Sequence, residues 1–238
     1  MELLAAGCLS QQQNELFARV LLWLQGQLSL KFVPADPTHA SIIYMCGLPT
    51  GQNLDRWRPL AGPVMAEHRY RNKPIYFSDV ICRPGFDARP WNQLKGARIG
   101  YNERLSFSGS AALLIEFDRL GIDPMDYTWV KTGSHQNSIA AVASGAVDLA
   151  AIDSMVLAME DWTGGMVATL GPWPAPPISI DVDLADRLDA IGNLLTTMHT
   201  NQEGRQILAG FGVSRFHSVD GEDYRSMAAL AERMSRQE

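Results

Sequence analysis

The stretch KTGSHQNSIAAVASGAVDLAAIDSM, residues 131–155, decides the fold of this chain. Its pattern is typical of a strand end, a polar turn, an Ala-rich helix, a glycine break and a buried strand ending in a carboxylate and a serine. In an open α/β sheet, ligands bind at the carboxyl ends of the strands, where the following helices present unpaired N–H groups. We therefore expect Ser134, His135 and Asp153 to converge on one cleft.

The neighbouring segments repeat this rhythm. Strands are predicted at 97–101, 127–131 and 147–152, alternating with helices at 108–120, 135–144 and 153–160. Alternation with short connections predicts an α/β fold, with a parallel sheet and right-handed crossovers. Two other regions are less regular. A short helix is predicted at 54–60, followed by a break at Gly62-Pro63 and a strand at 64–67, and a loop or short extended piece is predicted at 213–216.

Two segments predict a discontinuous architecture. The apolar strand predicted at 75–82 contains Ser78 and Asp79, and the segment 167–177 contains four prolines, which cannot lie in a central strand or a helix interior. These segments bracket a compact unit. We therefore expect one lobe from residues 1–78 and 172–238 and another from residues 79–171. Each lobe would be a mostly parallel sheet flanked by helices, with two hinge strands joining them, as in proteins that close around a ligand.

Composition and charge exclude several classes. The chain has 238 residues, of which 46% are hydrophobic and 19% charged, as expected for a soluble globular protein with a sizeable core. The net charge of −6 argues against a nucleic-acid partner, because such proteins carry a basic face. Cys8, Cys46 and Cys82 have neither zinc-ligand nor disulfide-framework spacing, and we predict no metal or cofactor.

The N-terminal region bears on localisation. Residues 4–8, LAAGC, look like a lipoprotein cleavage box, but only seven residues precede Cys8 and no basic region is present. The apolar segment 17–30 is shorter than the roughly 20 residues needed to span a bilayer. We expect no direct membrane insertion. The expected location is the cytoplasm if the chain is complete as printed, and the periplasm if a leader was removed.

Several short motifs together carry a family resemblance. They are Cys46-Gly47-Leu48-Pro49, Tyr76-Phe77-Ser78, Leu94-Lys95-Gly96, Ile99-Gly100-Tyr101-Asn102, Ser106-Phe107-Ser108-Gly109, Gly133-Ser134-His135 with Ser138-Ile139, and Val147-Asp148 followed by Ala151-Ile152-Asp153-Ser154. From about residue 44 to 157 their order and spacing resemble the solute-binding proteins of phosphate and phosphonate ABC transporters. Those proteins have the type II periplasmic-binding-protein fold, which the resemblance therefore implies for this chain.

The resemblance implies a small oxyanion ligand between the lobes and a transporter membrane subunit as partner. Ser106, the backbone of Phe107, and Ser108 would cradle the anion, His135 would donate to it, and Asp153 would accept from a hydroxyl or ammonium group. The full set of implied ligand-binding residues is Tyr76, Ser78, Ser106, Phe107, Ser108, Gly109, Ser134, His135 and Asp153. Neutral donors and helix dipoles can bind an oxyanion without a buried lysine or arginine.

Other interpretations of the same residues remain open. Ser106 and Ser108 are also good helix caps, Asp153 suits the cap of its own helix, and His135 suits a satisfied buried histidine. Gln136 departs from the family, which often has an acidic residue after this histidine. In the leading interpretation no residue is catalytic. The alternatives are a cytoplasmic enzyme resembling the dehydratases of menaquinone synthesis, with His135 as general base, and a ligand-sensing module.

Overall fold

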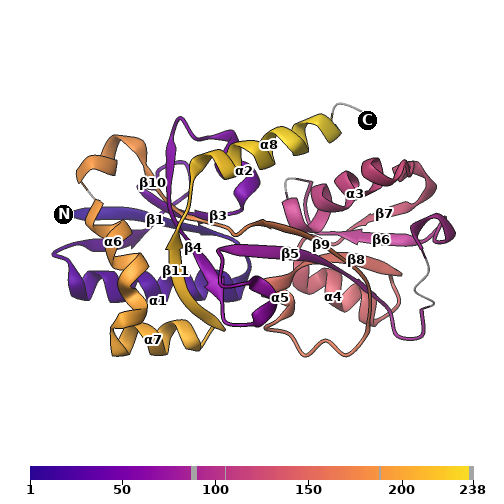
Figure 1. Cartoon of the computed structure of the whole chain (residues 1–238), viewed down its shortest axis with the longest axis horizontal. Coiled ribbons are helices and arrows are strands. Elements are labelled where there is room, and N and C mark those ends of the chain that lie inside the picture. Colours follow the sequence, from indigo (N-terminus) through magenta and orange to yellow (C-terminus); the bar gives the residue numbers. More distant parts are fainter. Residues whose placement is uncertain (87–89, 105, 188, 236–238) are drawn as a thin grey trace. The chain divides into compact units, whose positions relative to one another are not determined.

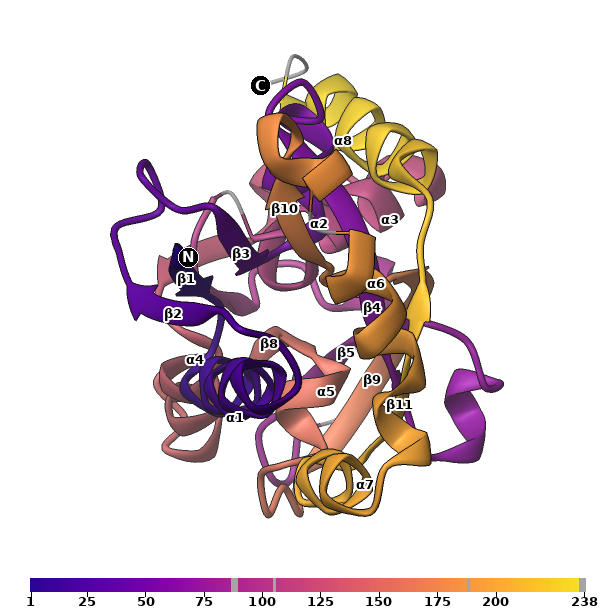
Figure 2. The same ribbon diagram turned by 90° about the vertical axis from the view of Figure 1, so that its left-hand side faces the viewer.

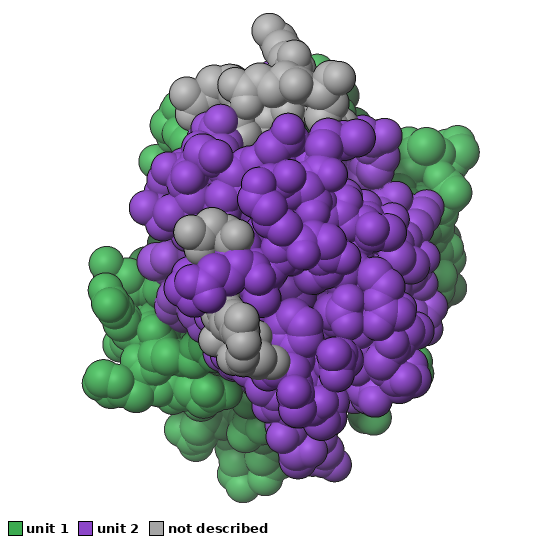
Figure 3. All heavy atoms as spheres, turned by 90° about the vertical axis from the view of Figure 1, so that its right-hand side faces the viewer, with its two compact units in different colours: residues 1–75, 174–228 green, residues 76–173, 229–238 purple. Residues whose placement is uncertain are grey.

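The computed structural model describes residues 1–86, 90–104, 106–187 and 189–235, and the chain divides into two compact units. Unit 1 comprises residues 1–75 and 174–228, and unit 2 comprises residues 76–173 and 229–238 (Figures 1 and 3). The predicted lobe boundaries, 78/79 and 171/172, differ from these limits by a few residues, and the chain from residue 229 is grouped with unit 2 instead of with unit 1. Residues 87–89, 105, 188 and 236–238, which those predicted lobes include, lie outside the described residues.

Unit 1 contains a six-stranded mixed sheet. Its strand order is β11-β4-β10-β3-β1-β2, in which β1 is parallel to both β2 and β3, while the β10–β3, β10–β4 and β11–β4 pairs are antiparallel. The strands are β1 Glu2–Cys8, β2 Lys31–Pro34, β3 Ile42–Met45, β4 Trp57–Met65, β10 Ile178–Asp181 and β11 Val213–Ser218. The expectation of a mostly parallel sheet is therefore wrong for this unit, because its second half is built from antiparallel returns.

The first helix of unit 1 begins where the sequence offers a side-chain cap. Helix α1 (Gln11–Gln27) starts at Ser10, whose side chain forms a capping box with Gln13, and it buries Leu16, Val20 and Leu24. The other helices are α2 Gly47–Gln52, α6 Asp189–Thr197, α7 Gln202–Ala209 and α8 Gly221–Ser235, the last of which extends into the residues of unit 2. Helix α7 packs on α1, and α6 packs on β4 and β11 (Figure 2).

Strand β4 corrects the prediction of a short helix at 54–60 and a break at Gly62-Pro63. The strand runs without interruption through Pro59 and Pro63, which lie opposite Ser179 of β10 and Phe216 of β11. The β10–β4 pair and the β11–β4 pair each contain a register shift. Such irregularities accompany prolines in strands, because proline has no backbone N–H to donate. Pairing with two distant segments overrides the local breaker signals. One of them is β11, whose residues 213–216 were predicted only as a loop or short extended piece.

Unit 2 contains a five-stranded sheet in the order β7-β6-β8-β5-β9. The strands are β5 Ile75–Cys82, β6 Arg98–Tyr101, β7 Thr128–Lys131, β8 Leu149–Asp153 and β9 Gly165–Pro174, and the helices are α3 Ala112–Leu120, α4 His135–Ala143 and α5 Ser154–Leu157. Strand β6 is parallel to β7 and β8, as predicted, whereas β5 is antiparallel to β8. The proline-rich segment lies mostly in β9, at the sheet edge, where missing N–H donors are tolerated.

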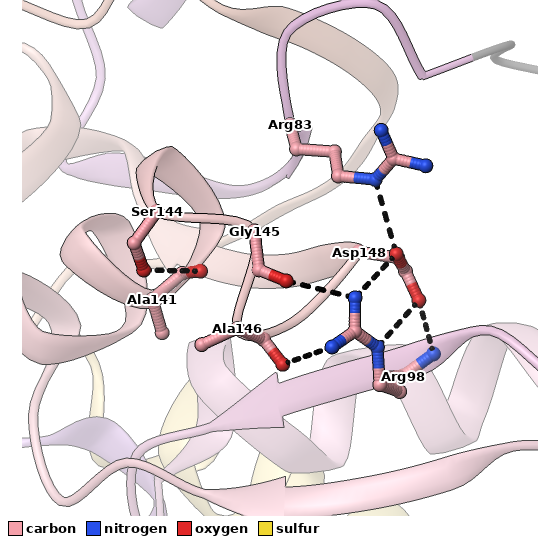
Figure 4. A network of polar contacts seen from close by, with 7 residues as sticks. All are labelled: Arg83, Arg98, Ala141, Ser144, Gly145, Ala146 and Asp148. Atoms are coloured by element: carbon pink, nitrogen blue, oxygen red, sulfur yellow. Dashed lines mark hydrogen bonds and ion pairs between the residues drawn. The ribbon is translucent and has the colours of Figure 1, made fainter.

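A buried core and a polar network hold unit 2 together. Val142 of α4 and Val156 of α5 pack with Ile81, Val147, Ala150 and Ile152 of the sheet region, and all are inaccessible to solvent. At the amino ends of β6 and β8, Asp148 accepts bonds from the backbone N–H and the guanidinium of Arg98 and from Arg83 Nε (Figure 4). These contacts fix the register of the parallel strands at the end opposite their carboxyl termini.

Candidate oxyanion site in unit 2

All nine predicted ligand-binding residues belong to unit 2. Four of them form the segment Ser106–Gly109, which opens a wide π-helical turn, Phe107–Ala111, leading into α3. The N–H of Ala111 donates to the Ser106 carbonyl oxygen at 3.2 Å, a bond that spans five residues. Ser106 Oγ accepts from the Gly109 N–H, also at 3.2 Å. Such π-turns occur frequently at functional sites, and the first N–H groups of a helix have no partner within it.

Gly109 is required by close packing against Asn102, the residue that follows β6. A Cβ atom at position 109 would lie 1.9 Å from Asn102 Oδ1, a separation that no pair of unbonded heavy atoms can adopt. The glycine therefore lets the turn approach the carboxyl end of β6. This contact places the Asn102 amide between the turn and the first residue of α4.

His135 is that first residue of α4, and its Nε2 atom has two polar neighbours. Ser108 Oγ lies 3.2 Å from Nε2, and Asn102 Nδ2 lies 3.3 Å from it. With the Asn102 amide turned so that Nδ2 faces the ring, the amide nitrogen donates, Nε2 accepts and the ring proton resides on Nδ1. Nδ1 is inaccessible to solvent and has no hydrogen-bond partner among the described residues. The site thus contains a buried N–H donor without an acceptor.

The protonation state of His135 follows from its surroundings. Burial disfavours the imidazolium and lowers the pKa of His135 to about 4, so the ring is neutral at physiological pH. The residue as a whole is only half-buried, but the nitrogen that carries the proton is fully enclosed. A neutral N–H at a helix N-terminus can donate to an anion without adding a positive charge.

Strand β5 contributes Tyr76 and Ser78, which point to the same face of the sheet because side chains alternate along a strand. Asp153 of β8 lies opposite Ser78 in the antiparallel register and therefore shares that face. The buried Ser78 Oγ donates to the carbonyl oxygen of Ser108. This bond ties the face of β5 that carries Tyr76 and Ser78 to the π-helical turn.

Asp153 and Ser134 both act as helix caps. Asp153 Oδ1 accepts from the Met155 N–H at 2.7 Å at the start of α5, and Ser134 Oγ accepts from the Asn137 N–H at 3.0 Å at the start of α4. The capping role weighed for Asp153 in the sequence is thus present. Phe107 is fully buried, with its ring 4.8 Å from the ring of Trp173 in an edge-to-face arrangement.

The structure brings together Ser78, Ser108 and His135 through hydrogen-bond distances, and Ser106 with Gly109 in one turn. It places Ser134 beside them in sequence but engaged in its cap, and Tyr76 and Asp153 on the neighbouring sheet face.

Asn102 and Trp173 were missed as site residues. Asn102 carried a usable signal, because it directly follows a strand in the same way as the residues of the opening stretch. Trp173 carried none, since its contact with Phe107 joins segments far apart in the sequence.

Among the described residues, no group of His, Cys, Asp and Glu is arranged to hold a metal ion. In the same residues, no helix combines the length and the apolar character required to cross a bilayer.

Two α/β units with mixed sheets are the architecture of the periplasmic-binding-protein fold. Residues 39–224 match the family described as "ABC transporter, phosphonate, periplasmic substrate-binding protein". The chain belongs to this family. The family resemblance stated from the sequence motifs is therefore confirmed, and so is the α/β fold class. By its description, the family consists of periplasmic substrate-binding proteins.

Solved structures support the same fold at low sequence identity. A binding protein component of an ABC phosphonate transporter from Pseudomonas aeruginosa matches with a TM-score of 0.79 and 17% identity, covering 98% of this chain and 87% of that one. PhnD1 from Prochlorococcus marinus, in complex with methylphosphonate, matches with a TM-score of 0.78 and 16% identity, covering 99% and 98%. A Xanthomonas citri protein bound to chloride matches with a TM-score of 0.75 and 12% identity, covering 100% and 99%. Comparison with curated protein sequences gives no match.

Proposed function

We propose that this chain binds a small phosphonate-like oxyanion at the candidate site of unit 2 and delivers it, in the periplasm, to the membrane subunits of an ABC importer. Membership of the family supports substrate binding, and the methylphosphonate complex of a structural relative supports the ligand class. One observation carries the proposal. It is the enclosed Nδ1–H of His135, which has no acceptor among the described residues.

An unpaired buried donor is unfavourable, and a bound oxyanion would satisfy it. Leaving a buried donor without a partner costs about 1–3 kcal/mol, whereas a hydrogen bond to a charged acceptor contributes about 1.5–3 kcal/mol. The N-termini of α4 and of the π-helical turn add positive potential at the same place. The neutral ring supplies a donor whose strength does not vary between pH 6 and 8, because its pKa is lowered to about 4.

The remaining predicted residues have roles that follow from their positions. Ser106, Ser108 and the backbone of Phe107 would surround the oxyanion, with Gly109 keeping the turn close to Asn102. Tyr76 would flank the ligand from β5. The Asp153 carboxylate would accept from a protonated ligand oxygen or from an ammonium group on the ligand.

The arrangement around His135 disfavours the enzymatic alternative. A general base needs a free lone pair within reach of a substrate proton. The Nε2 lone pair of His135 is engaged by Asn102 and Ser108, and Nδ1 carries the proton. We therefore propose binding without chemical conversion of the ligand.

Isothermal titration calorimetry with methylphosphonate tests the proposal. We expect the wild-type protein to bind, and His135→Ala to weaken binding by about 10- to 150-fold, the equivalent of one hydrogen bond to a charged acceptor. His68→Ala is the matched control, because His68 is exposed and lies in unit 1. Equal affinities in the two variants would reject the site. Consumption of the ligand, followed by phosphorus NMR, would point to catalysis instead.

A further inference from the structure

A second polar cavity lies wholly within unit 1, at the face where α6 packs on β4 and β11. Its volume is about 870 Å³, within the range of small-molecule sites. Its principal polar lining residues are Arg58, Asn72, Asp189, His199, Arg215 and His217. Leu60 and Phe216 add an apolar wall. No residue of the candidate oxyanion site contributes to this cavity.

Arg215 is held in place by neutral acceptors only. Its guanidinium donates to both oxygens of Asn72, the side-chain Oδ1 and the backbone carbonyl, the latter at 3.1 Å. Arg71 and Asn72 have φ angles of 52° and 57°, a left-handed conformation that non-glycine residues adopt uncommonly. This turn presents both Asn72 oxygens to one guanidinium. Within the described part of the chain no carboxylate pairs with Arg215, so its charge is uncompensated.

The other charged groups of the cavity do not neutralise Arg215. Asp189 forms an ion pair with Arg58, and these two charges balance each other. His217 Nδ1 lies 2.8 Å from the Ser218 carbonyl oxygen, to which it must donate, because a carbonyl only accepts. His199 Nδ1 is inaccessible to solvent and has no partner among the described residues. The cavity therefore carries an excess positive charge, and the His199 ring is part of its lining.

We infer that this cavity binds the phosphate group of a small organic phosphate monoester. Beyond its two bonds to Asn72, the Arg215 guanidinium keeps the Nε–H and one N–H on each terminal nitrogen. The Nε–H and the neighbouring terminal N–H are parallel donors that match two oxygens of one phosphate, and phosphate balances the charge. The His199 ring would supply a further polar contact. The volume exceeds that of the phosphate group, and Leu60 and Phe216 would lie against the organic part. The inference does not depend on the site in unit 2.

Glycerol 2-phosphate is the probe for calorimetry and for backbone amide NMR, with glycerol as the uncharged control. To separate the two sites, the titrations use the full chain, both wild type and with His135→Ala. We expect glycerol 2-phosphate to bind the His135→Ala protein and to shift the amide signals of residues 72, 199 and 215–218. Adding Arg215→Gln should weaken this binding by about tenfold or more. Adding Arg205→Gln, an exposed arginine on α7 outside the cavity, should leave it unchanged.

Two further variants keep the test decisive if Arg215→Gln does not fold, as judged by circular dichroism. Arg215→Lys retains the charge but loses the paired donors, and His199→Gln removes the ring, so each should weaken binding by severalfold. The inference is overturned if the probe does not bind at millimolar concentration, or if the variants in the cavity bind as tightly as Arg205→Gln. It is also overturned if His135→Ala abolishes all binding of the probe, because the probe then occupies unit 2 only.

Discussion

Ser78 of β5 donates its hydroxyl hydrogen to the carbonyl oxygen of Ser108, and this buried bond fastens the π-helical turn to the sheet of unit 2. The same turn presents the Ser108 hydroxyl to His135 at 3.2 Å. Ser78 thus fixes the position of Ser108, and Ser108 lies beside His135. The position of the Ser108 hydroxyl relative to His135 therefore depends on the bond that Ser78 makes.

Replacing Ser78 with alanine should therefore affect both stability and binding. The substitution leaves the Ser108 carbonyl oxygen without its buried donor, and we expect the free energy of unfolding to fall by about 1–3 kcal/mol. Methylphosphonate affinity should fall as well, because the turn loses its anchor. Urea denaturation and calorimetry measure the two effects. Ser144→Ala, which removes an exposed hydroxyl at the end of α4 (Figure 4), should change stability by less than about 0.5 kcal/mol.

Adding a methyl group at Gly109 should disrupt the contact with Asn102. The new Cβ atom would overlap Asn102 Oδ1, so either the turn or the amide that contacts His135 must move. We expect Gly109→Ala to lower the free energy of unfolding by about 1–3 kcal/mol, as overpacking does, and to weaken methylphosphonate binding. The control is Gly26→Ala in α1, where an added Cβ meets nothing within 4 Å and alanine should be neutral or stabilising. Unchanged binding in Gly109→Ala would show that the turn tolerates a different position of Asn102.

The stability of the protein should depend on pH through His135. Its pKa is lowered from 6.5 to about 4 in the folded state, so between these values the unfolded chain binds the proton more readily. Above about pH 6.5 the ring is neutral in both the folded and the unfolded chain, and its titration does not lower the free energy of unfolding. As the pH falls from 6.5 toward 4, the free energy of unfolding decreases by at most about 3 kcal/mol. Denaturation curves of wild type and His135→Gln should therefore converge or cross as the pH falls through this window. Parallel curves would mean that the ring titrates normally.

Asp148 should contribute stability in a different pH range. Its hydrogen bonds from Arg98 are the main cause that lowers the pKa of this carboxyl group from 3.8 to about 2. At pH values above 3.8, the pKa that this carboxyl group has without these contacts, the ionised Asp148 adds its full contribution to the free energy of unfolding. This contribution is lost as the pH falls toward 2. We expect Asp148→Asn to lower the free energy of unfolding by about 2 kcal/mol at pH 7, and by progressively less as the pH falls from 4 to 2.

The matched control for Asp148→Asn is Glu116→Gln. Glu116 pairs with Arg119 on the surface of α3, and exposed pairs of this type contribute about 0–1 kcal/mol. Urea denaturation at pH 7 compares the two variants directly. An equal loss in both would show that the Asp148 network (Figure 4) is no stronger than an ordinary surface pair.

Local patterns predicted unit 2 more completely than unit 1. The strands β6, β7 and β8 and the helices α3 and α4 follow from hydrophobic runs ended by glycine and from two serines, since short parallel βαβ units form from neighbouring segments. Ser106 caps the π-helical turn before α3, and Ser134 caps α4. In unit 1, strand β4 was predicted as a helix followed by a break. Its partners β10 and β11 come from more than 100 residues further along the chain, and no window of local sequence contains them.

The sequence by itself determined the family, the α/β class and the residue types at the strand ends, because the capping serines, the glycine turns and the buried strand before Asp153 are all local features. The tertiary structure decided which of these residues act together. The bond from Ser78 to Ser108, the contact of Asn102 with His135 and the loss of solvent around Nδ1 each join different strands and helices. Desolvation and hydrogen-bond geometry depend on every atom packed around a group, so they arise only once the chain has folded.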